Sequence, residues 1–324
     1  MQKVKKAGRW SAYFTSEKGR KFTLRLAAGA TIGLFAANFI PQTLLLEKYR
    51  ETVQCYRMGV EREIPDKVKK RVEMAMEKLQ LSKFEKSLIK PFVVYGFDNF
   101  HAGSTKYNSG AIIGVPANYS YGLPSDINPQ DVRFRNQLIN WNSESGKLLQ
   151  EALVLKEDEQ IFGICKSILQ AQTHKILLDS IYPAATFLIC YSSANGINQK
   201  FNFYARPMSL RLTLYAIIGL FGLGVWSFSK DFTQVYLDGE TDKELCKLGP
   251  EFIEAGVRYY DKILKKNMAL RTLLEDDTYT AKGNENYLVR QKSMPLTVRK
   301  SYFELRLEEL RKQLDEKQDQ AAAS

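Results

Sequence analysis

The chain has 324 residues, of which 44% are hydrophobic and 26% are charged, and its formal net charge is +11. The mean hydropathy of −0.31 excludes a protein that lies mostly within a bilayer, so most of the chain is expected to lie in water. The excess positive charge flanks apolar segments instead of covering a folded domain, which argues against a nucleic-acid-binding protein.

Residues 1–25 form a basic segment, with eight lysines and arginines against a single acidic residue, Glu17. Trp10, Tyr13 and Phe14 lie at helical spacing within it, so the segment is expected to form an amphipathic helix. A basic, acid-poor segment is more typical of a mitochondrial targeting region than of a secretory signal. A basic anchor beside the membrane explains the same residues, and both interpretations stay open.

Three apolar segments are candidates for membrane-spanning helices: residues 26–46, 176–194 and 212–229. The last has 18 uncharged residues, which give a helix of about 27 Å. In the first, Pro41 is expected to kink or end the helix, because proline lacks an amide donor. The second is the weakest because it contains Asp179, a carboxylate expected to lie in the headgroup layer or to contact another helix.

Residues 47–175, between the first two spans, are expected to form a soluble α+β region. A helix is predicted behind Pro65, and short apolar runs bounded by Gly, Pro and Asn predict the strands of a small sheet. The predicted strands are residues 92–95, 111–115 and 132–141. A single helical stretch is predicted to follow over residues 142–195 and to run into the second span.

The C-terminal residues 230–324 are expected to be soluble and helical, with an amphipathic helix over residues 251–274. A second helix is predicted to dock through apolar residues at heptad-like spacing, which are Phe303, Leu307, Leu310 and Leu314. The predicted fold class is therefore an α+β membrane protein. It has about three transmembrane helices, long amphipathic helices and a small β-sheet between the first and second spans.

The placement of charge predicts a topology. Residues 195–211, which connect the second and third spans, carry three basic residues and no acid. The positive-inside rule then puts this connector on the same side as residues 1–25. Residues 47–175 and 230–324 share the opposite compartment and are able to pack together.

The sequence contains no recognisable catalytic or metal-binding constellation. His101 and His174 are far apart and have no Cys, Asp or Glu at ligand spacing. The cysteines have no close spacing, so free thiols are favoured over a bridge among Cys55, Cys165 and Cys246. We therefore predict that the protein is not an enzyme and holds no metal or other cofactor.

Small residues mark the faces at which transmembrane helices can pack closely. Gly29, Gly33 and Ala37 form a stripe in the first span, and Gly219 and Gly222 form a second patch in the third span. The commoner use of such faces is packing within one monomer. The alternative is that one of them receives a helix of a partner.

Five motifs, in order across residues 20–303, resemble the transmembrane protein 177 family. They are Gly110–Ala117, Pro207–Arg211, Phe228–Asp231, the pair Gly256–Leu264 and Asn267–Leu274, and Met294–Thr297 followed by Arg299 and Lys300. Their residues of unknown role are Gly110, Gly114, Pro116, Pro207, Met208, Arg211, Asp231, Gly256, Tyr260, Asn267, Leu270 and Arg271. The chain departs from the family pattern in residues 47–90 and in a longer, more charged C-terminal helix.

The resemblance implies a non-enzymatic, multi-pass scaffold of the mitochondrial inner membrane that acts early in cytochrome c oxidase biogenesis. Its implied partners are nascent oxidase subunit II and the inner-membrane chaperone of that subunit, both of which it would stabilise. Copper would be supplied by other proteins, so copper-delivery proteins are indirect partners. Membrane lipid surrounds the spans, and no nucleic acid is expected.

Two alternatives remain at this stage. Asn118-Tyr119-Ser120 is an N-glycosylation acceptor in the region expected to face away from the N-terminus, which would suit a structural or interaction protein of the endoplasmic reticulum or another organelle. An intramembrane enzyme would need a polar pair within the bilayer, and Asp179 is the one acidic residue in the three segments.

Overall fold

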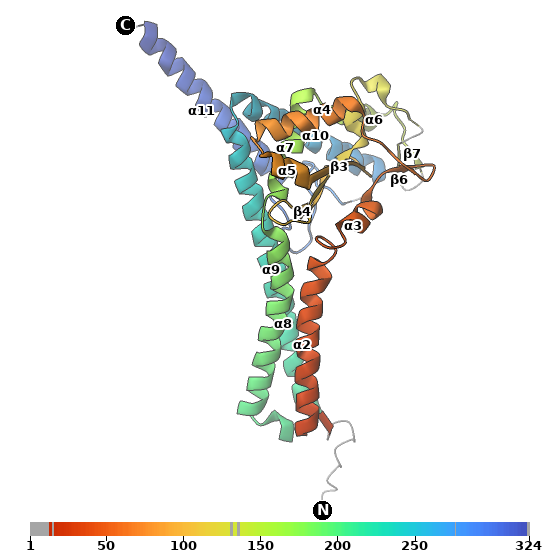
Figure 1. Ribbon diagram of the computed structural model, residues 1–324. Helices are drawn as coiled ribbons and strands as arrows, with labels where there is room; N and C mark the ends of the chain where they lie inside the picture. Colours follow the sequence, from red (N-terminus) through yellow and green to blue (C-terminus); the bar gives the residue numbers. More distant parts are fainter. Residues whose placement is uncertain (1–12, 15, 130–131, 135–136, 276, 323–324) are drawn as a thin grey trace, which may run out of the picture. The chain divides into compact units, whose positions relative to one another are not determined.

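The computed structural model describes residues 13–14, 16–129, 132–134, 137–275 and 277–322 (Figure 1). The chain divides into two compact units. The membrane unit consists of the described residues of Met1–Pro41 and Lys175–Thr233. The mixed unit consists of those of Gln42–His174 and Gln234–Ser324. Residues from 47–175 and from 230–324 thus share one compact unit, which confirms that these two regions pack together.

Among the described residues, three helices are long and apolar enough to cross a membrane. They are α2 (Glu17–Phe39), α8 (Lys175–Lys200) and α9 (Met208–Lys247). A short 3-10 turn, Phe203–Ala205, connects α8 to α9. The protein is therefore an α+β membrane protein with about three spans. Within the membrane unit, α2 and α8 lie side by side (Figure 1).

The bounds of α2 and α9 differ from those of the apolar segments that predicted them. Helix α2 begins well before residue 26, because Ser16 caps it by accepting a hydrogen bond from the Gly19 amide at 3.1 Å. It ends at Phe39, two residues before Pro41, so the end of the expected span 26–46 is not part of this helix. Helix α9 continues past Ser229 to Lys247, since no proline interrupts it.

Asp179 is buried in α8, with 7% of its surface exposed. Its Oδ2 lies 2.6 Å from Nζ of Lys175, one turn earlier on the same helix. An ion pair within one helix lowers the cost of placing a carboxylate there, because the opposite charge replaces part of the lost hydration. The carboxylate thus has a partner on its own helix, a role that the sequence did not indicate.

The mixed unit contains a three-stranded sheet in the order β3-β5-β4. Its strands are β3 (Ile89–Val94), β4 (Phe100–Ser104) and β5 (Gly110–Pro116). Strand β5 pairs in parallel with β3 and antiparallel with β4. The predicted strands over 92–95 and 111–115 are confirmed as β3 and β5. Strand β4 was not predicted because its sequence, Phe-His-Ala-Gly-Ser, contains no β-branched residue.

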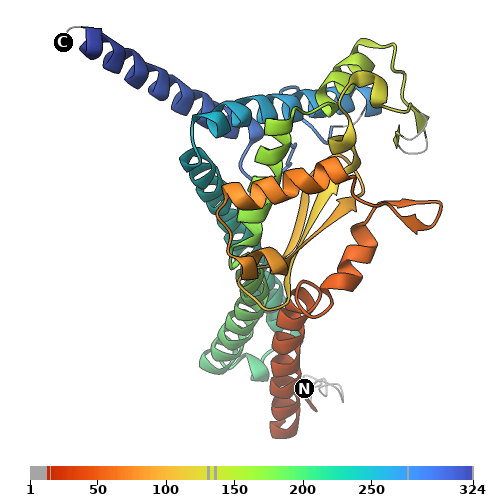
Figure 2. The ribbon, with the colours of Figure 1, turned by 45° about the horizontal axis from the view of Figure 1, so that its top comes forward.

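Helices cover both faces of this sheet. Ile112 of β5 packs with residues of α3 (Leu46–Val53), whereas its neighbour Ile113 packs with residues of α4 (Asp66–Lys78) and α7 (Glu157–Ala171). Successive residues of a strand point to opposite faces, so one continuous apolar run supplies two cores. Helix α10 (Pro250–Leu274) packs on α7, and α6 (Glu144–Leu153) and α11 (Leu296–Ala322) pack on α10. Figure 2 shows the three strands beside α4.

The remaining elements are short. They are α5 (Lys83–Leu88) and two hairpins, β1 (Tyr56–Arg57) with β2 (Val60–Glu61) and β6 (Arg133–Phe134) with β7 (Gln137–Leu138). The strand predicted over 132–141 is wrong where it is described, because β6 and β7 pair with each other. Residues 135–136 lie outside the described residues.

The single helix predicted over residues 142–195 is also wrong, because α6, α7 and α8 divide it. Val154 is extended, and α7 starts anew with a capping interaction in which the Glu159 carboxylate accepts a hydrogen bond from the Lys156 amide at 2.8 Å. Residues 1–12 of the expected N-terminal segment lie outside the described residues.

Candidate functional site

The small-residue stripe of α2 is exposed within the membrane unit. Gly29, Gly33 and Ala37 are all exposed. A Cβ added at Gly29 or Gly33 would meet no described atom within 4 Å. Ala27, about half a turn from Gly29, is 4% exposed. The stripe is therefore available for close helix packing.

The two glycines of the small-residue patch of α9 lie in different environments. Gly222 is buried, and a Cβ added there would overlap Sγ of Cys190 on α8. Gly219 is exposed, with no described atom within 4 Å of its Cβ position. Packing within the monomer therefore explains Gly222 and leaves Gly219 open.

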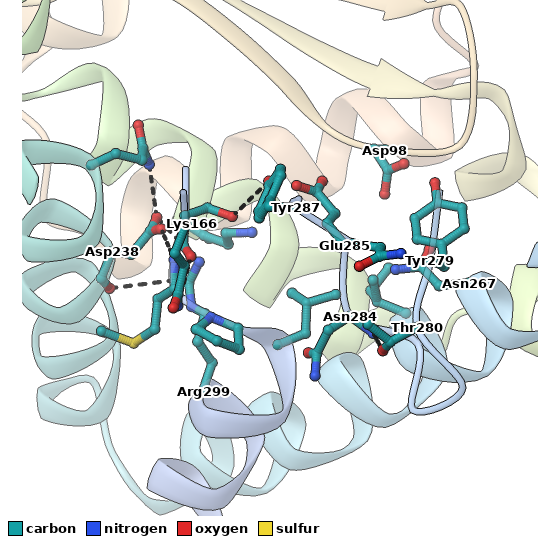
Figure 3. Close-up of a pocket in the computed structure, with 18 of the residues that line it drawn as sticks. Asp98, Lys166, Asp238, Asn267, Tyr279, Thr280, Asn284, Glu285, Tyr287 and Arg299 are labelled. Carbon is teal, nitrogen blue, oxygen red and sulfur yellow. Dashed lines mark hydrogen bonds and ion pairs between the residues drawn. The ribbon is translucent and has the colours of Figure 1, made fainter. Parts of the chain in front are cut away.

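The mixed unit contains a polar cavity of about 660 Å³ (Figure 3). Residues of α7, α9 and α10 line it, together with Asp98, Asn99 and His101 and with part of the segment 279–296, which leads into α11. Lys166, Asp238 and Arg299 lie toward one end of it, and Asp98, Asn267 and Tyr279 toward the other (Figure 3). Its wall combines charged, amide, hydroxyl and aromatic side chains.

A buried ion network forms one end of this cavity. Arg299 is 3% exposed and holds Asp242 with two hydrogen bonds, of 2.6 and 2.7 Å. It also contacts Oδ1 of Asp238 at 3.3 Å. The hydroxyl of Tyr260 donates to Asp242 at 2.9 Å. Burial raises the pKa of Tyr260 well above its ordinary value, so this hydroxyl keeps its proton.

Lys166 of α7 is half-buried at the same end of the cavity. Its ammonium lies 5.8 Å from the ring centre of Tyr260 and 5.9 Å from that of Tyr259, so it contacts aromatic faces. Burial and the positive charge of Arg299 lower its pKa to about 8. At the other end, Lys266 pairs with Asp98. Each end of the cavity therefore has a lysine, one that faces aromatic rings and one that is paired with a carboxylate.

Among the family-motif residues, the glycines occupy positions where a side chain does not fit. Gly110 has φ +74°, and a Cβ there would overlap the Leu88 carbonyl. Gly114 lies among side chains of β3 and β4, and a Cβ on Gly256 of α10 would approach Phe303 of α11 to 2.6 Å. Pro116 ends β5 and precedes a 3-10 turn. These residues allow neighbouring elements to pack closely, and they supply no reactive side chain.

The other motif residues of the mixed unit also hold its fold together. Asn267 Nδ2 donates to the Gly283 carbonyl at 2.8 Å, and Tyr260 belongs to the ion network. Leu270 is 4% exposed in the apolar cluster between α6 and α10. Arg271 lies 3.4 Å from Asp277.

The motif residues of the membrane unit lie near the ends of its spans. Pro207 and Met208 are exposed at the start of α9, and Arg211 follows one turn later with 8% exposure. Asp231 is 6% exposed. Arg211 lines a second pocket, which the sequence did not indicate.

No group of three or more His, Cys, Asp or Glu side chains in the described part of the chain is arranged to hold a metal ion. The four cysteines are free thiols, and Cys165 is fully buried. The network of Arg299, Asp238 and Asp242 was not predicted from the sequence. The four-residue spacing of the two aspartates on one helix was the available signal.

Comparison with known proteins gives consistent relatives. The chain is 30% identical to transmembrane protein 177 of Rattus norvegicus over 216 residues, which cover 65% of this chain and 69% of that protein. It is 27% identical to transmembrane protein 177 of Xenopus laevis over 289 residues, 87% of this chain and 92% of that protein. The human protein of the same name is 26% identical over 216 residues, 65% of this chain and 69% of that protein. No protein-family model matches the chain, and no solved structure is similar to it.

Proposed function

The chain belongs to the transmembrane protein 177 family, and from this premise we propose that it is a non-enzymatic scaffold of the mitochondrial inner membrane. In this proposal it holds newly made cytochrome c oxidase subunit II together with the membrane chaperone of that subunit. The two partners are thereby protected during assembly of the oxidase, and copper-delivery proteins act on the held subunit, so that the scaffold itself supplies no copper.

The exposed stripe of α2 is the observation that carries this proposal. In lipid, apolar surface alone does not drive helices together, because the lipid tails are equally apolar. A stripe of small residues allows a second backbone to approach closely and to gain van der Waals contact. Since α2 packs on α8 while Gly29, Gly33 and Ala37 remain exposed, the stripe suits a transmembrane helix of a partner.

Two local features disfavour the alternatives. Asn118, the glycosylation acceptor, is 3% exposed, and its Nδ2 donates to the Leu153 carbonyl at 2.9 Å. N-glycosylation would attach a glycan to this nitrogen. The folded chain has no room for a glycan there, which weakens the case for the endoplasmic reticulum. For an intramembrane enzyme, Asp179 would have to be available, but it pairs with Lys175.

The test is rescue of cells that lack the protein. Loss of the chain is expected to lower the steady-state levels of subunit II and its chaperone, and the wild-type chain is expected to restore both. Gly29→Leu and Gly33→Leu are expected to reach normal levels in the membrane but to restore the partners poorly. Leucine favours a helix more than glycine does, so the substitutions do not weaken α2 itself.

Ala28→Leu is the matched control, because Ala28 is an exposed small residue of α2 outside the stripe. It is expected to restore the partners as the wild type does. Unchanged partner levels in cells without the chain would reject the scaffold function. Full rescue by both stripe variants would instead place the partner contact elsewhere on the protein.

A further inference from the structure

The membrane unit contains a pocket of about 870 Å³ where the ends of its three helices meet. The first turns of α2, the last turns of α8 and the first turns of α9 line it, together with Tyr204 of the turn between α8 and α9. Part of this lining, including Arg20, Asn198 and Arg211, belongs to residues 1–25 and 195–211, the two basic segments that the charge pattern assigns to one side of the membrane.

One end of the pocket is basic. Arg20 and Lys21 of α2 and Arg211 of α9 line it. Glu17 is the acidic residue among the described residues of the lining, and its carboxylate pairs with Lys21 at 2.7 Å. The Arg211 guanidinium lies 5.7 Å from the ring centre of Tyr204. Basic pockets of this kind between transmembrane helices attract anionic lipid headgroups.

Asn198 of α8 is a second and independent feature of this end. It is 1% exposed, and its Nδ2 donates to the Tyr215 hydroxyl at 2.8 Å. Its Oδ1 is buried without a hydrogen-bond partner among the described residues. A buried acceptor that lacks a donor is costly. A ligand that brings a hydroxyl group to this position would satisfy it.

The other end of the pocket is apolar. Leu24, Phe187 and Ile218 line it, one from each helix. Phe187 and Asn198 are eleven residues apart on α8, so the pocket follows the helices for about 16 Å from its polar end. Gly219 leaves space in the wall, since no described atom lies within 4 Å of its Cβ position. An acyl chain suits such a surface.

We propose that this pocket binds one anionic glycerophospholipid with a hydroxyl-bearing headgroup, of the phosphatidylglycerol type. The phosphate lies among Arg20, Lys21 and Arg211, and the headgroup hydroxyl donates to Asn198 Oδ1. An acyl chain follows the apolar wall toward Gly219. A zwitterionic choline lipid has no hydroxyl donor and brings its own positive charge to the basic end, so it is expected to bind less well.

The charge part of the proposal is tested with the full-length chain purified in detergent and titrated with dioleoyl phosphatidylglycerol or dioleoyl phosphatidylcholine. Native mass spectrometry counts the bound lipids. We expect the wild type to retain one phosphatidylglycerol in preference to phosphatidylcholine. Arg20→Gln is expected to weaken this binding about fivefold. Arg25→Gln, on the same helix but outside the lining, carries the same charge change and is expected to bind as the wild type does.

The apolar part is tested by filling the wall. Gly219→Leu is expected to abolish retention of phosphatidylglycerol. Gly224→Leu is the control on the same helix, because its Cβ position is equally open and lies outside the lining. Equal binding of the two lipids, equal binding by Arg20→Gln and Arg25→Gln, or displacement of the lipid by inorganic phosphate would each overturn the proposal. The measurement involves no partner protein, so its failure leaves the scaffold function standing.

Discussion

The two units use the same residue types in opposite ways. In the mixed unit, Arg299 is buried and held by two carboxylates, and Gly256 lies against an aromatic ring. In the membrane unit, Gly29 and Gly33 face open space, and large apolar side chains such as Phe221 are 73% exposed. In water such exposure would be unfavourable, whereas lipid tails cover it without cost. The surroundings of a unit therefore decide the role of these residue types. In water, glycine and aromatic residues pack inside the fold, whereas in lipid they can remain exposed and contact a partner.

The largest effect that this comparison predicts concerns the buried ion network. Arg299→Met removes the cation and leaves Asp238 and Asp242 buried without it, which is expected to destabilise the mixed unit by about 3–5 kcal/mol. The apparent melting temperature of the purified protein is expected to fall by roughly 10 °C. Arg306→Met, on the same helix, breaks an exposed pair with Glu309 and is expected to cost at most about 1 kcal/mol. Similar melting temperatures for the two variants would mean that the network does not stabilise the unit.

A smaller effect is predicted for matched glycine substitutions in the two units. Gly256→Ala puts a methyl group against Phe303 and Phe162, and the resulting strain is expected to cost about 1–3 kcal/mol. Gly33→Ala meets no described atom within 4 Å, and alanine favours a helix by about 1 kcal/mol relative to glycine. It is therefore expected to leave the melting temperature unchanged or slightly raised. Destabilisation by both substitutions would show that the stripe of α2 is packed in the isolated protein.

The sequence predicted best those features that depend on the pattern of a single segment. The apolar runs indicated the three described helices that are long and apolar enough to cross a membrane, and the runs around Phe92 and Ile112 indicated two of the three central strands. Strand β4 was not predicted because it contains no β-branched residue and its position depends on pairing with β5. The prediction of a single helix over 142–195 was wrong because a capping interaction at Lys156 begins a new helix. The apolar pattern continues across this break and does not indicate it.

The candidate sites depended more on tertiary structure. The stripe of α2 and the patch of α9 were visible in the sequence, but which of their faces is covered depends on the packing of α8. Similarly, Phe303 is fully buried and Leu310 partly so, whereas Leu314 in the same expected docking stripe is 57% exposed. The two pockets join segments that are distant in sequence. No local pattern therefore linked Arg20 to Arg211, or Lys166 to Arg299.

The smallest predicted effect is a pH dependence that belongs to the mixed unit. The pKa of Lys166 is lowered to about 8 by burial and by Arg299, whereas a lysine in the unfolded chain has a pKa of about 10.4. Between these values the unfolded chain holds a proton that the folded chain has lost, so this group makes the fold more stable as the pH rises from about 8 to 10. Lys166→Met removes the cost of keeping this charge in the folded chain and is expected to stabilise the protein at pH 7 by on the order of 1 kcal/mol. The melting temperature of the variant minus that of the wild type is therefore expected to be positive at pH 7 and to shrink toward pH 10.

Lys69→Met, at an exposed site on α4, is expected to show no such trend. A difference for Lys166→Met that stays constant with pH would mean that this ammonium is well solvated, and the contrast between the two units would then rest on their packing and on the buried Arg299 network.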